Sequence, residues 1–245
     1  MASTTSPNVA PTTTTATATP PTATIPVIDV GPLLSSKQPN TAVEASKVAQ
    51  QIDEALRSIG FFYVRNHQVS TNLISQLWDT AREFFALPEA EKMKIDMKLG
   101  GRAWRGFFPC GGELTSGVPD HKEGLYFGAD LPSDHPTVLQ KLPFHGQNQY
   151  PGAVPAMKTV VREYMDKLTI LGHSIMKGLA LALNLKPNFF KDAMTSDPFT
   201  PFRIFNYPAP VCCSSILSLS SSSCVVLLVL NRSFDIMSNK WFGLP

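Results

Sequence analysis

A His-x-Glu motif followed by a distant histidine is the pattern in this sequence that most directly suggests metal chemistry. His121 and Glu123 form the motif, and His173 lies 50 residues after Glu123. Two imidazoles and one carboxylate are suitable ligands for iron(II), and such a set leaves metal positions open for other reactants. The alternative is that these are ordinary surface and helix residues, because apolar residues repeat at helical spacing around His173. We favour this alternative.

The four cysteines do not add to this chemistry. Cys110 stands alone, and Cys212, Cys213 and Cys224 all follow residue 210. None belongs to a Cys-x-x-Cys pair, so the sequence predicts neither a disulfide framework nor a zinc site.

The composition is typical of a soluble globular domain. Of the 245 residues, 43% are hydrophobic and 16% are charged, which are ordinary values. The 21 basic residues nearly balance the 19 acidic ones and form no basic block, which argues against nucleic acid or an anionic membrane as a partner. We expect a cytoplasmic location.

The first 24 residues consist almost entirely of Ala, Ser, Thr and Pro and carry no charged side chain. Such a segment has no apolar periodicity to offset the entropy of ordering it, so it predicts a disordered leader. A transit peptide is the alternative, but those are rich in Arg and this segment has none.

From Ile25 the pattern mixes strands and helices. Residues 25–30 predict a short strand, and the capping box Thr41-x-x-Glu44 starts a helix that ends at Gly60. Residues 61–64 predict a buried strand, because they are aromatic and β-branched.

Apolar residues at helical spacing predict two further helices. Residues 73–85 form one such stripe, whose aromatic side chains we expect in the core, and Pro88 begins a short helix after it. Residues 154–185 predict a long helix. Between them lies a loop-rich region with short strands at 103–108 and 125–127.

The tail from residue 211 allows three interpretations. Val211–Leu230 is long enough for a membrane helix, but seven of its twenty residues are Ser, which disfavours an anchor. Val225–Leu230 could instead pair as a strand with an open sheet edge. The third interpretation is a translated intron or misjoined exon, which the abrupt change of composition favours.

Six segments before the tail carry a family resemblance. They are Ile25–Val30, Ile59–His67, Phe84–Pro88 with Glu91–Lys92, Arg102–Phe108, Asp120–Gly128 and Phe202–Pro208. In this order they resemble the N-terminal part of plant-type 2-oxoglutarate and iron(II)-dependent dioxygenases of the isopenicillin N synthase-like superfamily.

The resemblance implies an α+β fold in several parts. Residues 25–153 would form the N-terminal domain, and 154–210 the long buttressing helix with the first strands of a double-stranded β-helix, or jelly roll. A jelly roll needs about eight strands. We therefore expect an incomplete core, followed by the aberrant tail at 211–245.

The resemblance also implies two cofactors, iron(II) and 2-oxoglutarate, and it specifies the motifs that bind them. Family members bind iron(II) through His-x-Asp and a later His, and grip 2-oxoglutarate through Arg-x-Ser. Neither motif follows Tyr207. We therefore expect a truncated, inactive family member that binds no cofactor. The active members of the family would act on a small organic substrate. The alternatives are an interaction or regulatory fragment and a tail-anchored protein.

Four residues have positions that the resemblance associates with ligands. Tyr207 matches a tyrosine that contacts 2-oxoglutarate, although a plain strand tyrosine is an equal alternative. Arg102, Trp104 and Arg105 match a loop near the substrate mouth, where a structural role is at least as plausible.

Overall fold

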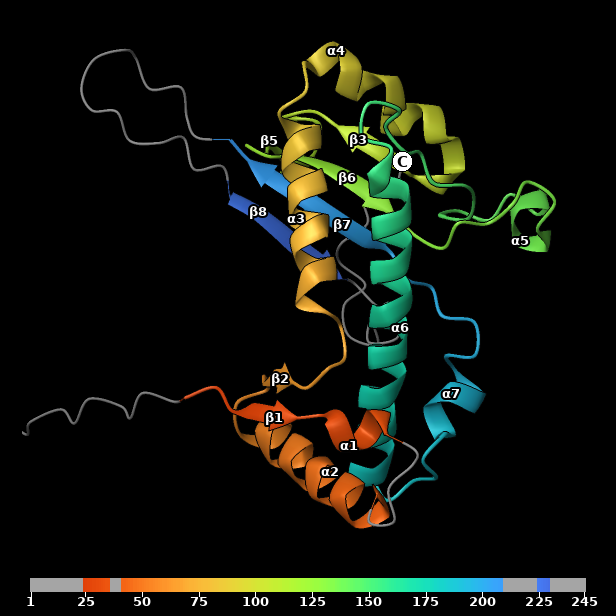
Figure 1. The fold of residues 1–245 in the computed structure, drawn as a ribbon. Helices are drawn as coiled ribbons and strands as arrows, with labels where there is room; N and C mark the ends of the chain where they lie inside the picture. Colours follow the sequence, from red (N-terminus) through yellow and green to blue (C-terminus); the bar gives the residue numbers. More distant parts are fainter. Residues whose placement is uncertain (1–23, 36–40, 209–223, 230–245) are drawn as a thin grey trace, which may run out of the picture.

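The computed structural model describes residues 24–35, 41–208 and 224–229 (Figure 1). The predicted leader and most of the tail lie outside the described residues. Within them the chain combines helices with small sheets, which confirms the α+β class.

A four-stranded antiparallel sheet is the central element. Its strands are β3 (Gly106–Phe108), β6 (Glu123–Phe127), β7 (Phe202–Tyr207) and β8 (Cys224–Val229), in the order β3-β6-β7-β8. Strand β7 pairs with β6 from Phe202 to Asn206, and with β8 along its whole length. The sheet thus joins segments that are about eighty residues apart in sequence.

Two helices cover one face of this sheet. They are α3 (Thr71–Phe85) and α6 (Ala156–Ala182), which run across the strands in Figure 1. Helix α3 begins after Ser70, whose hydroxyl accepts a hydrogen bond from the Leu73 amide and so satisfies a free donor of the first turn. Fully buried side chains fill the space between the helices and the sheet: Leu77, Phe84, Phe107, Leu125, Phe127, Met157, Val161, Phe202 and Ile204.

A second core lies at the other end of α6. Here α1 (Gly31–Leu34) and α2 (Thr41–Ser58) pack against α6, beside the strands β1 (Val27–Asp29) and β2 (Tyr63–Arg65). At Gly178 of α6, an added Cβ would lie 2.8 Å from the Ile52 side chain and 2.9 Å from Leu33. A larger residue here would push aside the ends of these two side chains, so glycine allows the helices to approach closely.

Short elements complete the described chain. They are α4 (Glu89–Lys92), the 3₁₀ helices η1 (Met93–Ile95) and η2 (Met97–Ala103), the hairpin strands β4 (Leu114–Thr115) and β5 (Val118–Pro119), α5 (Pro136–Leu139) and α7 (Phe189–Ala193).

The structure corrects the predicted buried strand at residues 61–64. Strand β2 begins only at Tyr63, and it pairs with β1 alone. Phe61 and Tyr63 are 68% and 61% exposed, whereas Phe62 and Val64 pack against the second core. One face of this two-stranded sheet has no covering element among the described residues, so alternate side chains face outward.

The strand predicted at 103–108 is also shorter than expected. Trp104 has a left-handed backbone, with φ of 53°, which no strand can contain, so β3 begins at Gly106. Pro88 stands just before α4 rather than inside it, and α2 begins at Thr41 itself, each a shift of one residue.

The tail contributes one described element. Strand β8 extends the sheet beside β7, as the strand interpretation of residues 225–230 predicts, one residue earlier. None of the described helices is both long and apolar enough to cross a membrane.

Candidate functional site

The sheet face opposite α3 and α6 combines aromatic with charged side chains. Side chains alternate along β7, so Phe202 and Ile204 enter the main core while Phe205 joins Phe108 and Tyr126 in a separate cluster. The Phe108 ring lies 5.5 Å from Tyr126 and 6.2 Å from Phe205. We call this surface the aromatic face.

Tyr126 is the polar centre of the aromatic face. Its hydroxyl donates a short hydrogen bond to the Glu113 carboxylate, and the Arg203 guanidinium lies 4.3 Å above its ring. Burial, together with the bond to Glu113, raises the pKa of Tyr126 above its ordinary value. The tyrosine therefore stays protonated and acts as a donor.

Lys122 pairs with Glu113 of the same cluster and with one further acid, Asp120. Its ammonium lies 2.8 Å from Asp120 and 3.2 Å from Glu113, and 4.9 Å from the centre of the Phe205 ring. Burial lowers the pKa of Lys122, but hydrogen bonds to the two carboxylates outweigh this effect and leave the pKa raised. The lysine is a fixed positive charge held against an aromatic ring.

Tyr207, the predicted 2-oxoglutarate contact, ends β7 beside this face. Its ring centre lies 6.4 Å from that of Phe205, and its side chain is 39% exposed. The partial exposure leaves the tyrosine accessible to a ligand, and the predicted contact stays a prediction.

Glu123, the carboxylate of the candidate iron triad, is already bound on both oxygens. Lys92 donates to Oε2 at 2.7 Å and the Asn206 amide donates to Oε1 at 2.8 Å. All three residues are at least 90% buried, and the Lys92 ammonium lies 5.3 Å from the Phe107 ring centre. Replacing Lys92 by a metal would leave a buried charge without its partner.

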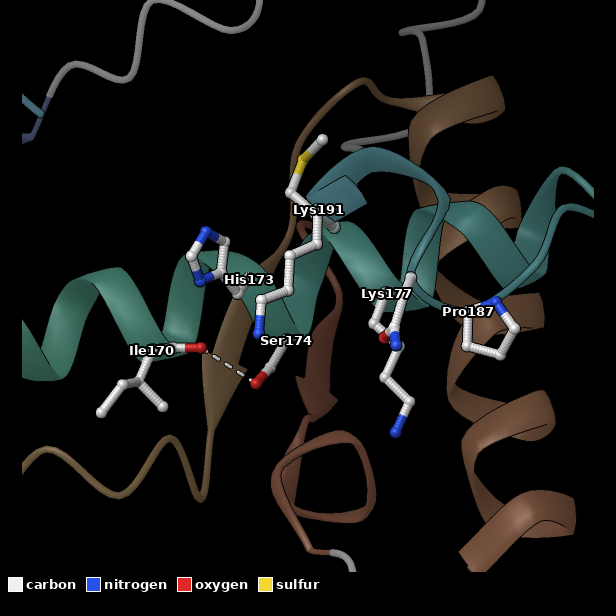
Figure 2. A pocket seen from close by; sticks show the side chains of 8 residues that line it. Ile170, His173, Ser174, Lys177, Pro187 and Lys191 are labelled. Carbon is white, nitrogen blue, oxygen red and sulfur yellow. Dashed lines mark hydrogen bonds between the residues drawn. The ribbon is translucent and has the colours of Figure 1, made fainter. Parts of the chain in front are cut away.

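The two histidines of the triad lie on different parts of the fold. The His121 Nε2 atom is 3.1 Å from the Pro208 carbonyl oxygen at the end of β7. The His173 Nε2 donates to the carbonyl of Thr195, 2.9 Å away, beside α7. Figure 1 shows α7 next to the half of α6 that is remote from β6, and Figure 2 shows His173 in the pocket there.

The structure thus does not bring the candidate triad together. Among the residues that the structure describes, no group of three His, Cys, Asp or Glu side chains is placed to hold a metal ion. Cys110 is a free, exposed thiol.

The Arg102 to Arg105 segment fastens a neighbouring loop. Arg102 donates to the Lys141 carbonyl at 3.1 Å, and buried Arg105 donates to the Phe144 carbonyl at 2.8 Å. Burial lowers the pKa of Arg105 to about 10. Trp104 contacts the Phe144 ring edge-on at 5.7 Å. These contacts are structural, and a place for the segment near the substrate mouth stays a prediction.

Sequence reasoning missed the partners Lys92, Glu113 and Arg203. A usable signal existed, because Glu123 and Arg203 are the charged residues of strands that consist mostly of aromatic and aliphatic residues. Buried charges need partners, so their positions alone indicate ion pairs or cation–π contacts.

Comparison with known proteins agrees with this architecture. Residues 25–153, just over half of the chain, match the family described as "non-haem dioxygenase in morphine synthesis N-terminal". A 2OG-Fe(II) oxygenase family protein of Caulobacter crescentus has a similar structure, with a TM-score of 0.62 and 27% identity over 77% of this chain and 58% of that one. The fold is therefore that of a non-haem oxygenase.

Curated relatives give the same assignment. A Dictyostelium discoideum protein described as a probable iron/ascorbate oxidoreductase is 39% identical over 76% of this chain and 52% of its own length. A homoarginine-6-hydroxylase of Glycine max is 36% identical over 75% of this chain and 56% of its own. The chain belongs to the 2-oxoglutarate and iron(II)-dependent dioxygenase family, and it spans about half the length of these relatives.

The described residues do not fit the iron that this family uses. Glu123 is bound to Lys92 and Asn206, His121 contacts Pro208, and His173 is bound to Thr195. Iron(II) in such enzymes needs two imidazoles and a carboxylate with free lone pairs on one side of the metal, and this arrangement is not met.

Proposed function

We propose that this chain provides the N-terminal domain and opening strands of a dioxygenase that couples oxidation of 2-oxoglutarate to oxidation of a small organic substrate. The observation that carries the proposal is the antiparallel sheet with helices on one face and the aromatic face on the other. The family match over residues 25–153 supports it. Oxidoreductase chemistry of this kind needs metal ligands from outside the described residues.

Tyr207 is the residue of this chain that we assign to 2-oxoglutarate. It is partly exposed at the end of β7, and its phenol can donate one hydrogen bond to a carboxylate. A single neutral hydrogen bond contributes only about 0.5 to 1.5 kcal/mol. Tyr207 therefore orients the co-substrate but does not hold it without a metal and a cationic partner.

The 245-residue chain by itself is, in this proposal, not catalytically competent. The sequence contains five histidines, and none of them begins a His-x-Asp motif. The one His-x-Glu motif has its carboxylate committed to Lys92 and Asn206. Without three free ligands there is no reason to expect turnover of 2-oxoglutarate.

A chimera tests the positive half of the proposal. Residues 25–208 would be joined to the C-terminal half of the Dictyostelium discoideum relative, which is 39% identical over the shared part. The chimera should form succinate from 2-oxoglutarate when iron(II) and oxygen are supplied. Tyr207→Phe should raise the KM for 2-oxoglutarate about three- to tenfold, as loss of one hydrogen bond predicts.

Two controls make the result decisive. Tyr63→Phe, at an exposed position on β2, should leave this KM unchanged. A soluble, folded chimera without succinate formation would contradict the proposed function. The 245-residue chain should give no succinate, and turnover that disappears in His121→Ala would contradict the proposal that it is inactive.

A further inference from the structure

A pocket between α6 and α7 lies apart from the aromatic face. It has a volume of about 250 Å³ and opens between the second half of α6 and the segment that leads into α7. His173, Ser174 and Lys177 line it from α6, and Pro187 and Lys191 from the segment that includes α7 (Figure 2). Asn188 also belongs to the lining. This volume accommodates one small ligand with a few waters.

The pocket is held in shape by contacts that do not depend on a ligand. His173 on α6 donates to the carbonyl of Thr195, which is 1% exposed, and so ties the end of α7 to α6. The Thr195 hydroxyl in turn lies 3.3 Å from the Phe190 carbonyl. Met176, 8% exposed, also lines the pocket. A preformed pocket loses less entropy on binding.

The lining is basic and contains no acid. Two lysines and one histidine face it, and no Asp or Glu is among the lining residues. Within the described part of the chain, neither Lys177 nor Lys191 forms a salt bridge, whereas Lys47, Lys92, Lys94 and Lys122 do. Asp192 follows Lys191 on α7 but is not part of the lining. Two uncompensated ammonium groups around one cavity favour an anion.

The hydrogen-bonding groups that line the pocket restrict which class of anion can bind there. The Ser174 hydroxyl donates to the Ile170 carbonyl at 3.0 Å, so its oxygen is left to accept a bond from the ligand (Figure 2). A phosphate carrying one proton offers both negative oxygens for lysines and an O–H donor for Ser174. A carboxylate is better matched by the planar fork of arginine, and no arginine lines this pocket.

We propose that the α6–α7 pocket binds inorganic phosphate, which at neutral pH keeps one proton as HPO₄²⁻. Lys177 and Lys191 neutralise its charge, and Ser174 accepts a hydrogen bond from its protonated oxygen. The pocket lies apart from the aromatic face and from Tyr207. The phosphate proposal therefore does not depend on the proposed dioxygenase function.

Calorimetric titration of the 245-residue chain tests this site. Inorganic phosphate should bind with one-to-one stoichiometry, and glycerol 3-phosphate, a monoester whose dianion has no O–H on its phosphate at neutral pH, should bind more weakly. Lys177→Gln and Lys191→Gln should each weaken binding about tenfold, as loss of one charged hydrogen bond predicts. Sulfate, which carries no proton at neutral pH, should bind more weakly than phosphate.

The matched control is Lys167→Gln, an exposed lysine on the same helix that does not line the pocket. It should leave the affinity unchanged, and circular dichroism should show the same helix content in all variants. Equal weakening in Lys167→Gln would show unspecific charge attraction and overturn the proposal. Failure of phosphate to bind at 10 mM, on the order of ten times a weak Kd of 1 mM, would overturn it too.

Discussion

The two faces of the central sheet are built on different principles. The face toward α3 and α6 is a continuous apolar core, with Phe127, Phe202 and Ile204 at most 1% exposed. The aromatic face combines rings with charges, since Tyr126 lies between the Glu113 carboxylate and the Arg203 guanidinium. The first face is held by burial and the second by directional contacts.

The difference separates the residues that stabilise the fold from those that could bind a ligand. Burial of apolar surface is non-directional and contributes in proportion to area, so the helical face tolerates changes that keep shape. Charged contacts fix individual atoms, and they fail when one partner is lost. We therefore expect the helical face to dominate folding and the aromatic face to be adapted to function.

The largest expected effect is on the helical face. Phe127→Ala removes a fully buried ring that stacks on Tyr150 and Phe202, with ring centres 5.6 and 6.2 Å away. The cavity should lower the free energy of unfolding by about 3 to 5 kcal/mol, measured by urea denaturation. Phe61→Ala, at a 68% exposed position, is the control and should change it by less than about 0.5 kcal/mol.

The Lys92–Glu123 pair combines both kinds of contact, because it is a charged pair that is buried at the edge of the core. Glu123→Leu would leave the Lys92 ammonium and the Asn206 amide without their partner, and should cost about 3 kcal/mol. The double variant Lys92→Met with Glu123→Leu should be more stable than Glu123→Leu alone. Additive losses in this double-mutant cycle would contradict a coupled pair.

On the aromatic face, Tyr126→Phe should cost less, about 1.5 kcal/mol, because Glu113 keeps its ion pair with Lys122. The variant should also change the pH dependence of stability. Burial and Glu113 raise the pKa of folded Tyr126 above the unfolded value of about 10. This contribution to stability is complete below about pH 10 and is lost as the pH rises.

Urea denaturation between pH 9 and 11 checks that sign. Stability of the parent chain should fall as the pH rises, and Tyr126→Phe should reduce the slope by about half a proton at pH 10 and by nearly one proton, about 1.2 kcal/mol per pH unit, at pH 11. Tyr150 and Tyr164, whose pKa values burial also raises, should sustain the remaining slope. An unchanged slope would mean that Tyr126 is not held as a donor.

The smallest effect concerns the start of α3, which covers the helical face. Ser70→Ala removes the acceptor of the Leu73 amide and should lower the free energy of unfolding by about 1 kcal/mol. Ser75→Ala, at an exposed position inside the same helix, should be neutral or slightly stabilising, because alanine favours helix. Equal losses at both positions would argue against the cap.

The helical face could be predicted from sequence better than the aromatic face. Periodicity located α3 and α6 within two or three residues, and their apolar stripes are the residues that form the cores. Periodicity could not find the partners of Glu123, since Lys92 and Asn206 are 31 and 83 residues away in sequence. It also placed Phe61 inside, because composition does not reveal that β1 and β2 form a sheet of only two strands.

This chain has the framework of a 2-oxoglutarate-dependent dioxygenase, but it does not assemble an iron site from His121, Glu123 and His173. Anaerobic titration of the purified 245-residue chain with iron(II), followed by equilibrium dialysis, tests it most directly. We expect no saturable binding of iron(II), and no difference between the parent chain and His121→Ala. One equivalent of tightly bound iron(II), lost on His121→Ala or Glu123→Gln, would contradict it.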